Sequence, residues 1–162
     1  MFQDEARFGT LTSFSRAWYL RGKDFVVTNK QGRANFYTYA AVAPETGEIF
    51  SQNLNVANLE NMSNFLLNIS AKYSEKSILM IMDRAPWHTS KKLNIPQNIQ
   101  LMFLPPCSPQ LNPAEHLWKH MRSEYIHNVV FDKIEDISDC VTHALQCLTA
   151  EKIKTLCACN YL

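Results

Sequence analysis

The 162-residue chain is 46% hydrophobic and 19% charged, a balance typical of one folded domain and unlike that of a disordered chain. No stretch approaches the ~18 apolar residues of a membrane span, and Met1 precedes Phe-Gln-Asp-Glu rather than a basic region and an apolar run, so no membrane or export segment is predicted. Sixteen Lys and Arg against fifteen Asp and Glu leave a net charge of +1, which does not by itself indicate a nucleic-acid partner.

Strand patterns begin almost at Met1. Alternation over the first residues places one set of side chains on the same side of an extended segment, namely Phe2, Asp4, Ala6 and Phe8. Residues 35–43 are rich in aromatic and small side chains, and residues 48–54 form a second extended run. Residues 44–47, Pro-Glu-Thr-Gly, have turn chemistry, so the two runs predict a hairpin.

The connection between the first strand and the hairpin is basic. Residues 7–33 contain six basic residues and a single acid, Asp24. The basic residues are Arg7, Arg16, Arg21, Lys23, Lys30 and Arg33. Such a stretch is either an edge that attracts phosphate groups or a solvated loop, and the second interpretation is favoured.

A helix and a buried strand follow. Asn58 is a suitable N-cap for a helix whose apolar residues recur at helical spacing, as Leu59, Met62, Leu66, Ile69 and Tyr73 do. Residues 77–82 form an apolar run of strand length, as expected for a strand buried on both faces, and they end directly at Asp83. A short helix is predicted near residues 88–93.

Helical patterns dominate the last third of the chain. Residues 100–104 predict another strand, and the proline-rich segment 105–109 should stiffen the connection after it. Asn112 is predicted to cap a helix with Pro113 at its first position. A last helical region carries Ile134, Ile137, Val141, Leu145 and Leu148. This order of elements predicts a mixed α/β fold.

Three carboxylates stand at the joints of this arrangement. Asp4 lies on the first strand, Asp83 at the carboxyl end of the buried strand, and Glu115 in the first turn of a helix. Asp83 alone also suits an Asx turn. Glu115 alone also suits a capping box with Asn112 or an ion pair with Lys119 one turn later.

Three segments of the chain resemble the signatures of mariner-superfamily transposases, nearest their bacterial insertion-sequence branch. They are residues 4–9 (DEARFG), 83–88 (DRAPWH) and 105–118 (PPCSPQLNPAEHLW). The third is the most specific, because it combines a rigid loop, a helix cap and a carboxylate. The resemblance implies a ribonuclease H-like α/β fold, a mixed five-stranded sheet flanked by helices. Its first and fourth strands would be neighbours, bringing Asp4 beside Asp83 with Glu115 approaching from the later helix.

The resemblance also implies a DDE-type transposase catalytic domain, in which Asp4, Asp83 and Glu115 are the catalytic residues and the metal ligands. Mg²⁺ prefers oxygen ligands and is usually held by a few carboxylates together with phosphates, so three acids suit two Mg²⁺ ions, with Mn²⁺ expected to substitute. The implied partners are DNA, as element ends and target, and a second copy of the chain in the DNA complex. The alternatives are a ribonuclease H-like nuclease or resolvase without strand transfer, and a non-catalytic DNA-binding or assembly remnant.

Further residues are expected around this site. Lys119 and Arg122 share a helical face with Glu115 and are candidates for DNA contacts, with a solvated charged face as the alternative. Arg84, which stands where many members of the superfamily have Asn, is a further candidate. His88 is predicted to contact DNA or to support the metal site, with a structural histidine as the alternative.

Two supporting residues complete the predicted site. Glu5 should point to the opposite strand face from Asp4, and it is assigned with Asn112 to positions that support the metal ligands.

Other histidines, cysteines and tryptophans carry weaker signals. His116 and His120 are spaced i and i+4, but no third ligand at familiar spacing completes a zinc site. The odd number of cysteines without a C-x-x-C pair predicts reduced, intracellular thiols, which are Cys107, Cys140, Cys147, Cys157 and Cys159. Trp18, Trp87 and Trp118 either stack on bases or pack in the core, and core packing is favoured for Trp118.

Residues 1–162 are predicted to form one catalytic domain without the N-terminal helix-turn-helix region that members of this superfamily usually carry. The chain is therefore expected to be a fragment, a separately encoded second half or the catalytic domain alone. We expect it to be cytoplasmic and associated with the nucleoid when it is bound to DNA.

Overall fold

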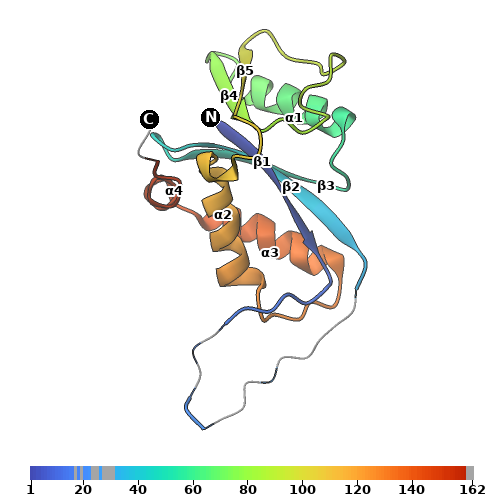
Figure 1. Ribbon diagram of the computed structural model, residues 1–162, viewed down its shortest axis with the longest axis vertical. Coiled ribbons are helices and arrows are strands. Elements are labelled where there is room, and N and C mark those ends of the chain that lie inside the picture. The colour runs from blue at the N-terminus through green and yellow to red at the C-terminus, as the bar shows by residue number, and fades with distance from the viewer. Residues whose placement is uncertain (17, 19, 23–25, 27–31, 160–162) are drawn as a thin grey trace.

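The computed structural model describes residues 1–16, 18, 20–22, 26 and 32–159 (Figure 1). The predicted basic stretch is therefore described only in part, because Lys23, Asp24 and Lys30 lie outside these residues. No helix in the described part of the chain is long and apolar enough to cross a bilayer.

A five-stranded mixed sheet forms the centre of the fold. Its strands lie in the order β3-β2-β1-β4-β5 and comprise β1 (Phe2–Gly9), β2 (Asn35–Ala43), β3 (Glu48–Leu54), β4 (Ile78–Met82) and β5 (Ile99–Phe103). β2 is antiparallel to β1 and β3, whereas β4 is parallel to β1 and β5. The sheet type and the neighbouring first and fourth strands are as predicted.

The hairpin of β2 and β3 forms with the predicted bounds. Gly47 has a φ of 73°, a conformation that glycine adopts without steric cost, and its N–H donates to the Ala43 carbonyl at 2.8 Å. A Cβ atom at Gly47 would lie 2.3 Å from the carbonyl oxygen of Ala150. This glycine therefore closes the turn and also allows residue 150 to approach it.

Helices cover both faces of the sheet (Figure 1). They are α1 (Leu59–Lys72), α2 (Ala114–Met121), α3 (Ile134–Cys147) and α4 (Ala150–Leu156), with a π-helical turn, η2 (Arg122–Ile126), directly after α2. One core joins α1 to side chains of β2, β4 and β5. The other joins α2 and α3 to Phe2, Ala6 and Phe8 of β1. The alternation of β1 thus decides which of its side chains face α2.

The start and the buried face of α1 are as predicted. The side-chain oxygen of Asn58 accepts the N–H of Asn61 at 2.8 Å and caps the helix. Met62, Leu66 and Ile69 of the predicted stripe are fully buried, and Phe65 widens the stripe.

Two predictions for the middle of the chain are wrong. β4 is not buried on both faces, since Leu79 is 42% exposed, because α2, α3 and α4 pack mainly on β1, β2 and β3. The helix expected near residues 88–93 is replaced by turns that the Ala85 and Ser90 carbonyls close. The hydroxyl of Ser90 also accepts the N–H of Lys92, a local contact that competes with helical hydrogen bonds.

The last predicted helical region is α3, and a further helix that was not predicted, α4, follows it. Leu148 ends α3 with an extended ψ of 119°, and the Thr149 hydroxyl caps α4 by accepting the N–H of Lys152 at 3.2 Å. Thr149 was the sequence signal for this break, because threonine is a favoured N-cap. Ile153 of α4 is buried in the same core as Ile137 of α3.

Asn112 ties the proline-rich loop to β1. α2 begins at Ala114, one residue later than predicted, yet the Asn112 side chain makes a capping contact, accepting the Ala114 N–H at 3.2 Å. Its amide group also donates to the Gln3 carbonyl at 3.0 Å. Asn112 is 4% exposed, so both hydrogen bonds are shielded from water. The side chain therefore holds the start of α2 against the strand that carries Asp4.

Asn112→Ala should lower the free energy of unfolding by about 2 kcal/mol, because it leaves the Gln3 carbonyl and the Ala114 N–H without these partners. Urea denaturation in EDTA measures the change. Asn64→Ala, at an exposed position of α1, is the control and should change stability by less than about 0.5 kcal/mol. Equal losses in the two variants would contradict the anchoring role.

Candidate active site

Three acidic side chains line one pocket. Asp4 lies on β1, Asp83 follows β4 directly, and Glu115 lies in the first turn of α2. Phe2 of β1 is level with Ile81 of β4, so two residues further along these parallel strands Asp4 comes level with Asp83. The pocket has a volume of about 400 Å³, and the proline-rich loop forms its other wall.

Asp4 is the most enclosed of the three. The indole N–H of Trp118 donates to its Oδ2 at 3.0 Å, and Trp118 itself is 1% exposed in the core. Burial first, and then the negative charges of Glu115 and Glu5, raise the pKa of Asp4 to about 7. The pocket therefore holds more negative charge around Asp4 than its hydrogen bonds offset.

Asp83 is more open, with 58% of its side chain exposed. Its Oδ1 accepts the N–H of Ala85 at 3.0 Å, which is an Asx-turn contact, and lies 2.7 Å from Nδ1 of His88. The hydrogen bond with His88 is the main reason that the pKa of Asp83 lies below its usual range. Asp83 is thus a turn residue and a pocket residue at once.

His88 joins Asp83 to Glu5. Its Nε2 lies 2.9 Å from Oε1 of Glu5, an oxygen that also accepts the indole N–H of Trp87 at 3.3 Å. Burial by itself lowers the pKa of His88, but the hydrogen bonds and charges of the two carboxylates outweigh it and raise the pKa to about 9. The protonated ring then donates one hydrogen bond to Asp83 and one to Glu5. Glu5 is therefore linked to Asp83 through the ring of His88.

Glu115 is exposed at the pocket wall. The N–H of Asn112, which a capping box would use, donates to the Pro109 carbonyl at 2.9 Å. Among the described residues no ion pair joins Glu115 to Lys119. Glu115 therefore forms neither the capping box with Asn112 nor the ion pair with Lys119. It lines the pocket together with Asp4 and Asp83.

The predicted DNA-binding side chains differ in exposure. Arg84 lines the acidic pocket, and its Nε donates to the Leu104 carbonyl at 3.2 Å. Lys119 and Arg122 line a second pocket, of about 580 Å³, that adjoins Glu115. His88 is 2% exposed, which contradicts a direct contact with DNA, because carboxylates occupy both ring nitrogens.

Two contacts of this site escaped the sequence analysis. Trp118 is in the core as predicted, but its hydrogen bond to Asp4 joins residues 114 positions apart, and no local pattern indicates it. The link from Glu5 through His88 to Asp83 was also missed, although the histidine in residues 83–88 was a signal for it. Trp18, which was predicted either to stack on bases or to pack in the core, is fully exposed.

The chemistry of the pocket suits a divalent cation held by oxygen atoms. In the described part of the chain, no three His, Cys, Asp or Glu side chains form one closed ligand cluster. Mg²⁺ does not need such a cluster, since it keeps several waters and shares carboxylates with phosphate ligands. A cation near Asp4 and Glu115 would relieve the repulsion that raises the pKa of Asp4. Asp4, Asp83 and Glu115 are therefore the residues suited to hold it.

The fold is that of a ribonuclease H-like protein, with acids on the neighbouring first and fourth strands and on a later helix. The chain belongs to the DDE superfamily endonuclease family, whose sequence pattern matches residues 1–138. This match confirms the family resemblance at the level of the superfamily.

Similar proteins include one bacterial sequence and several solved structures. The uncharacterized protein y4pE/y4sA of Sinorhizobium fredii (strain NBRC 101917 / NGR234) is 39% identical over 108 residues, 66% of this chain and 78% of that protein. The Mos1 strand transfer complex matches with a TM-score of 0.71 at 17% identity, covering 96% of this chain and 49% of the Mos1 chain. The Mos1 mariner paired end complex with Mn matches with a TM-score of 0.71 at 15% identity, covering 96% of this chain and 50% of the other. The chain thus spans about half the length of the Mos1 chains, and at these identities the likeness shows the fold.

The charge on His88 predicts a pH-dependent stability of the metal-free protein. The folded pKa of about 9 lies above the unfolded value of 6.5, so this stabilisation is complete below pH 6.5 and is lost as the pH rises through 9. The stability difference between wild type and His88→Gln should shrink by about 2 kcal/mol from pH 6 to pH 10, after allowance for the exposure of Asp83.

Urea denaturation in EDTA at both pH values measures this difference. His143→Gln, at an exposed position of α3, should follow the wild-type pH dependence. A difference between wild type and His88→Gln that stays constant with pH would contradict a protonated His88.

Proposed function

We propose that this chain is the catalytic domain of a DNA transposase, which cleaves phosphodiester bonds at the ends of a mobile element and joins the freed 3′ ends to target DNA. The observation that carries the proposal is that acids from three distant parts of the chain line one pocket, in a member of the DDE superfamily of endonucleases. The Mos1 structures, a strand transfer complex and paired end complexes, support the same kind of chemistry.

In this proposal Asp4, Asp83 and Glu115 hold two Mg²⁺ ions, for which Mn²⁺ substitutes. When bound, such ions activate the attacking water or 3′-hydroxyl and stabilise the leaving oxygen. The protein positions the ligands: the Trp118 indole fixes one oxygen of Asp4, and His88 fixes one oxygen of Asp83. Mos1 complexes described as containing Mn and Mg support the choice of metal.

The remaining residues of the site act on the ligands and on DNA. Glu5 orients His88, and Asn112 fixes the start of the helix that carries Glu115. Arg84, Lys119 and Arg122 stand on the rim, where they would contact phosphates. Pairing of two element ends requires two catalytic sites, so we infer that two copies of the chain act together on DNA.

Asp83→Asn should reduce metal-dependent cleavage of duplex DNA by roughly 100-fold or more, because an amide cannot replace the charge of a metal-binding carboxylate. The assay is nicking of a supercoiled plasmid in Mn²⁺, with EDTA as the blank. Asp139→Asn removes an exposed carboxylate of α3 and should cut like wild type. Equal rates for the two variants would remove Asp83 from the catalytic set.

Crystals soaked in Mn²⁺ should show anomalous density against oxygen atoms of Asp4, Asp83 and Glu115. The carboxylates gather on one pocket, so each should lie within ligand distance of an ion. Asp83→Asn crystals should lose part of the signal. Density elsewhere, with none at these three residues, would contradict the assignment.

The products of the cleavage assay separate transposition from its alternatives. A pre-cut element end that becomes covalently joined to a second DNA supports strand transfer. Cutting without joining indicates a ribonuclease H-like nuclease, and DNA binding with no metal-dependent cutting indicates a non-catalytic remnant.

A further inference from the structure

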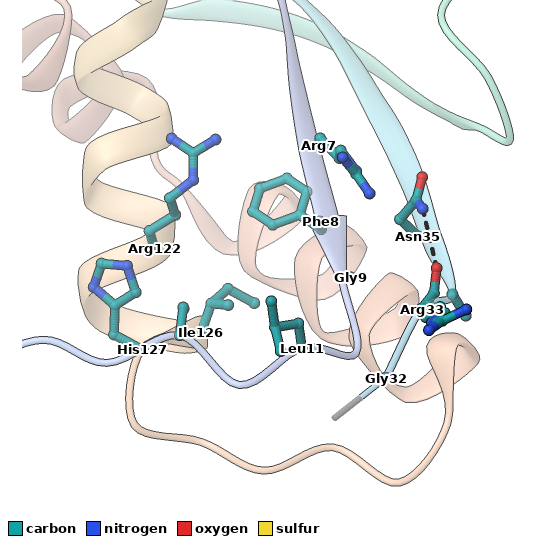
Figure 2. Close-up of a pocket in the computed structure, with 12 residues that line it drawn as sticks. Arg7, Phe8, Gly9, Leu11, Gly32, Arg33, Asn35, Arg122, Ile126 and His127 are labelled. Atoms are coloured by element: carbon teal, nitrogen blue, oxygen red, sulfur yellow. Dashed lines mark hydrogen bonds between the residues drawn. The ribbon is translucent and has the colours of Figure 1, made fainter. Parts of the chain in front are cut away.

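A third pocket, here called the basic pocket, lies at the far end of β1 from Asp4. The charged residues that line it are basic. It has a volume of about 580 Å³. Figure 2 shows Arg122 and His127 on the helical side and Arg7 and Arg33 on the strand side, with Phe8 between them. No Asp or Glu is among the described residues that line it. The pocket is therefore suited to an anionic ligand.

This basic pocket and the acidic pocket each share lining residues with a pocket beside α2. The pocket beside α2 is lined by Glu115, Lys119, Arg122 and His127. It shares Glu115 with the acidic pocket and shares Arg122 and His127 with the basic one. The three pockets thus follow one another from the acids, past α2, to the end of β1, and neighbouring pockets have lining residues in common.

The π-helical turn η2 lies between the pocket beside α2 and the basic pocket. The N–H of His127 donates to the Arg122 carbonyl at 2.7 Å, an i to i+5 bond that widens the turn, and such turns are frequent at functional sites. Nδ1 of His127 is buried, and within the described residues it has no hydrogen-bond partner. A buried polar atom without a partner is costly, and the residue that carries it lines both this pocket and the pocket beside α2.

The segment after β1 is fixed against this turn. Asn128 adopts a φ of 62°, its N–H donates to the Ser13 carbonyl at 2.9 Å, and its side chain exchanges two hydrogen bonds with the backbone of Ser15 at 3.1 and 3.2 Å. On the other side, a Cβ at Gly32 would lie 1.9 Å from Oγ1 of Thr10. These contacts hold the segment after β1, which forms one wall of the basic pocket, in a defined position. They favour a formed site over a solvated loop.

The arginines of the basic pocket are available to a ligand. Among the described residues, no carboxylate forms an ion pair with Arg7, Arg33 or Arg122. Arg7 and Arg33 are exposed, and the Arg122 guanidinium lies 5.7 Å from the centre of the Phe8 ring, a contact that orients it. Arg122 lies beside Phe8 on the face of β1 that α2 covers, whereas Arg7 alternates with Phe8 and projects from the other face. The cations therefore stand on both sides of the end of β1.

We propose that Lys119, Arg122, Arg7 and Arg33, here called the cationic groove, hold the sugar-phosphate backbone of the DNA beside the active site. This inference rests on the proposed function, because it takes DNA as the substrate. Arg122 follows Glu115 by seven residues, roughly 10 Å along a helix, which is about three nucleotides at 3.4 Å each. The groove therefore binds the backbone at a short distance from the cut, without reading bases.

The test is a salt titration of DNA affinity with the full chain. Fluorescence anisotropy with a labelled 20-base-pair duplex, in Ca²⁺ to prevent cutting, gives the affinity at several KCl concentrations. Arg7→Gln/Arg33→Gln should weaken binding roughly tenfold and lower the slope of log affinity against log salt by about two, since each phosphate contact contributes about 0.9. Lys91→Gln/Lys152→Gln removes the same charge from exposed positions outside the groove and should keep the wild-type slope.

The same preparations, assayed for plasmid cutting in Mn²⁺, separate this inference from the proposed function. A wild type that cuts, with equal slopes for the two double variants, would overturn the groove alone. A lower slope in the arginine variant beside a wild type that never cuts would support the groove and overturn the proposed function. A wild type that does not bind the duplex would overturn both. Circular dichroism and urea denaturation confirm that both variants fold.

Discussion

The enclosure of the Asp4 carboxyl next to the negative charge of Glu115 is the constraint around which the pocket is arranged. Burial in a pocket disfavours the charged form of Asp4, and the negative charge of Glu115 disfavours it further. Enclosing the Asp4 carboxyl beside another acid, with no cationic partner among the described residues, costs stability. The structure nevertheless holds both acids in place, with Trp118 on one and Asn112 at the start of the helix that carries the other.

The two sides of the acidic pocket differ in whether a cationic side chain offsets their negative charge. On the Asp83 side, His88 lies between two carboxylates and offsets their charge. On the Asp4 side, the described residues provide an indole N–H but no cationic partner. A proton or a metal ion must therefore accompany the acids on that side. Beyond Glu115 the balance of charge is reversed, because among the described residues no carboxylate forms an ion pair with Arg7, Arg33 or Arg122.

Local patterns explain how much of this could be predicted. The hairpin and α1 follow from alternation, turn residues and an N-cap, all contained in short segments, and they form as expected. The three acids were singled out by their positions at the joints of predicted elements and by the family signatures around them. The exposure of Leu79 and the contact of Trp118 with Asp4 depend on which helices cover which part of the sheet. That information is spread over distant segments, so no single window of the sequence contains it.

The hydrogen bond from Asn112 to the Gln3 carbonyl has a thermodynamic consequence for any ligand of the pocket. It joins the loop to the very strand that bears Asp4, so the two walls fluctuate together. An incoming ion or phosphate meets walls whose spacing is already set, and little conformational entropy is left to be lost on association. Preorganisation of this kind favours a reacting geometry over a merely adhesive one.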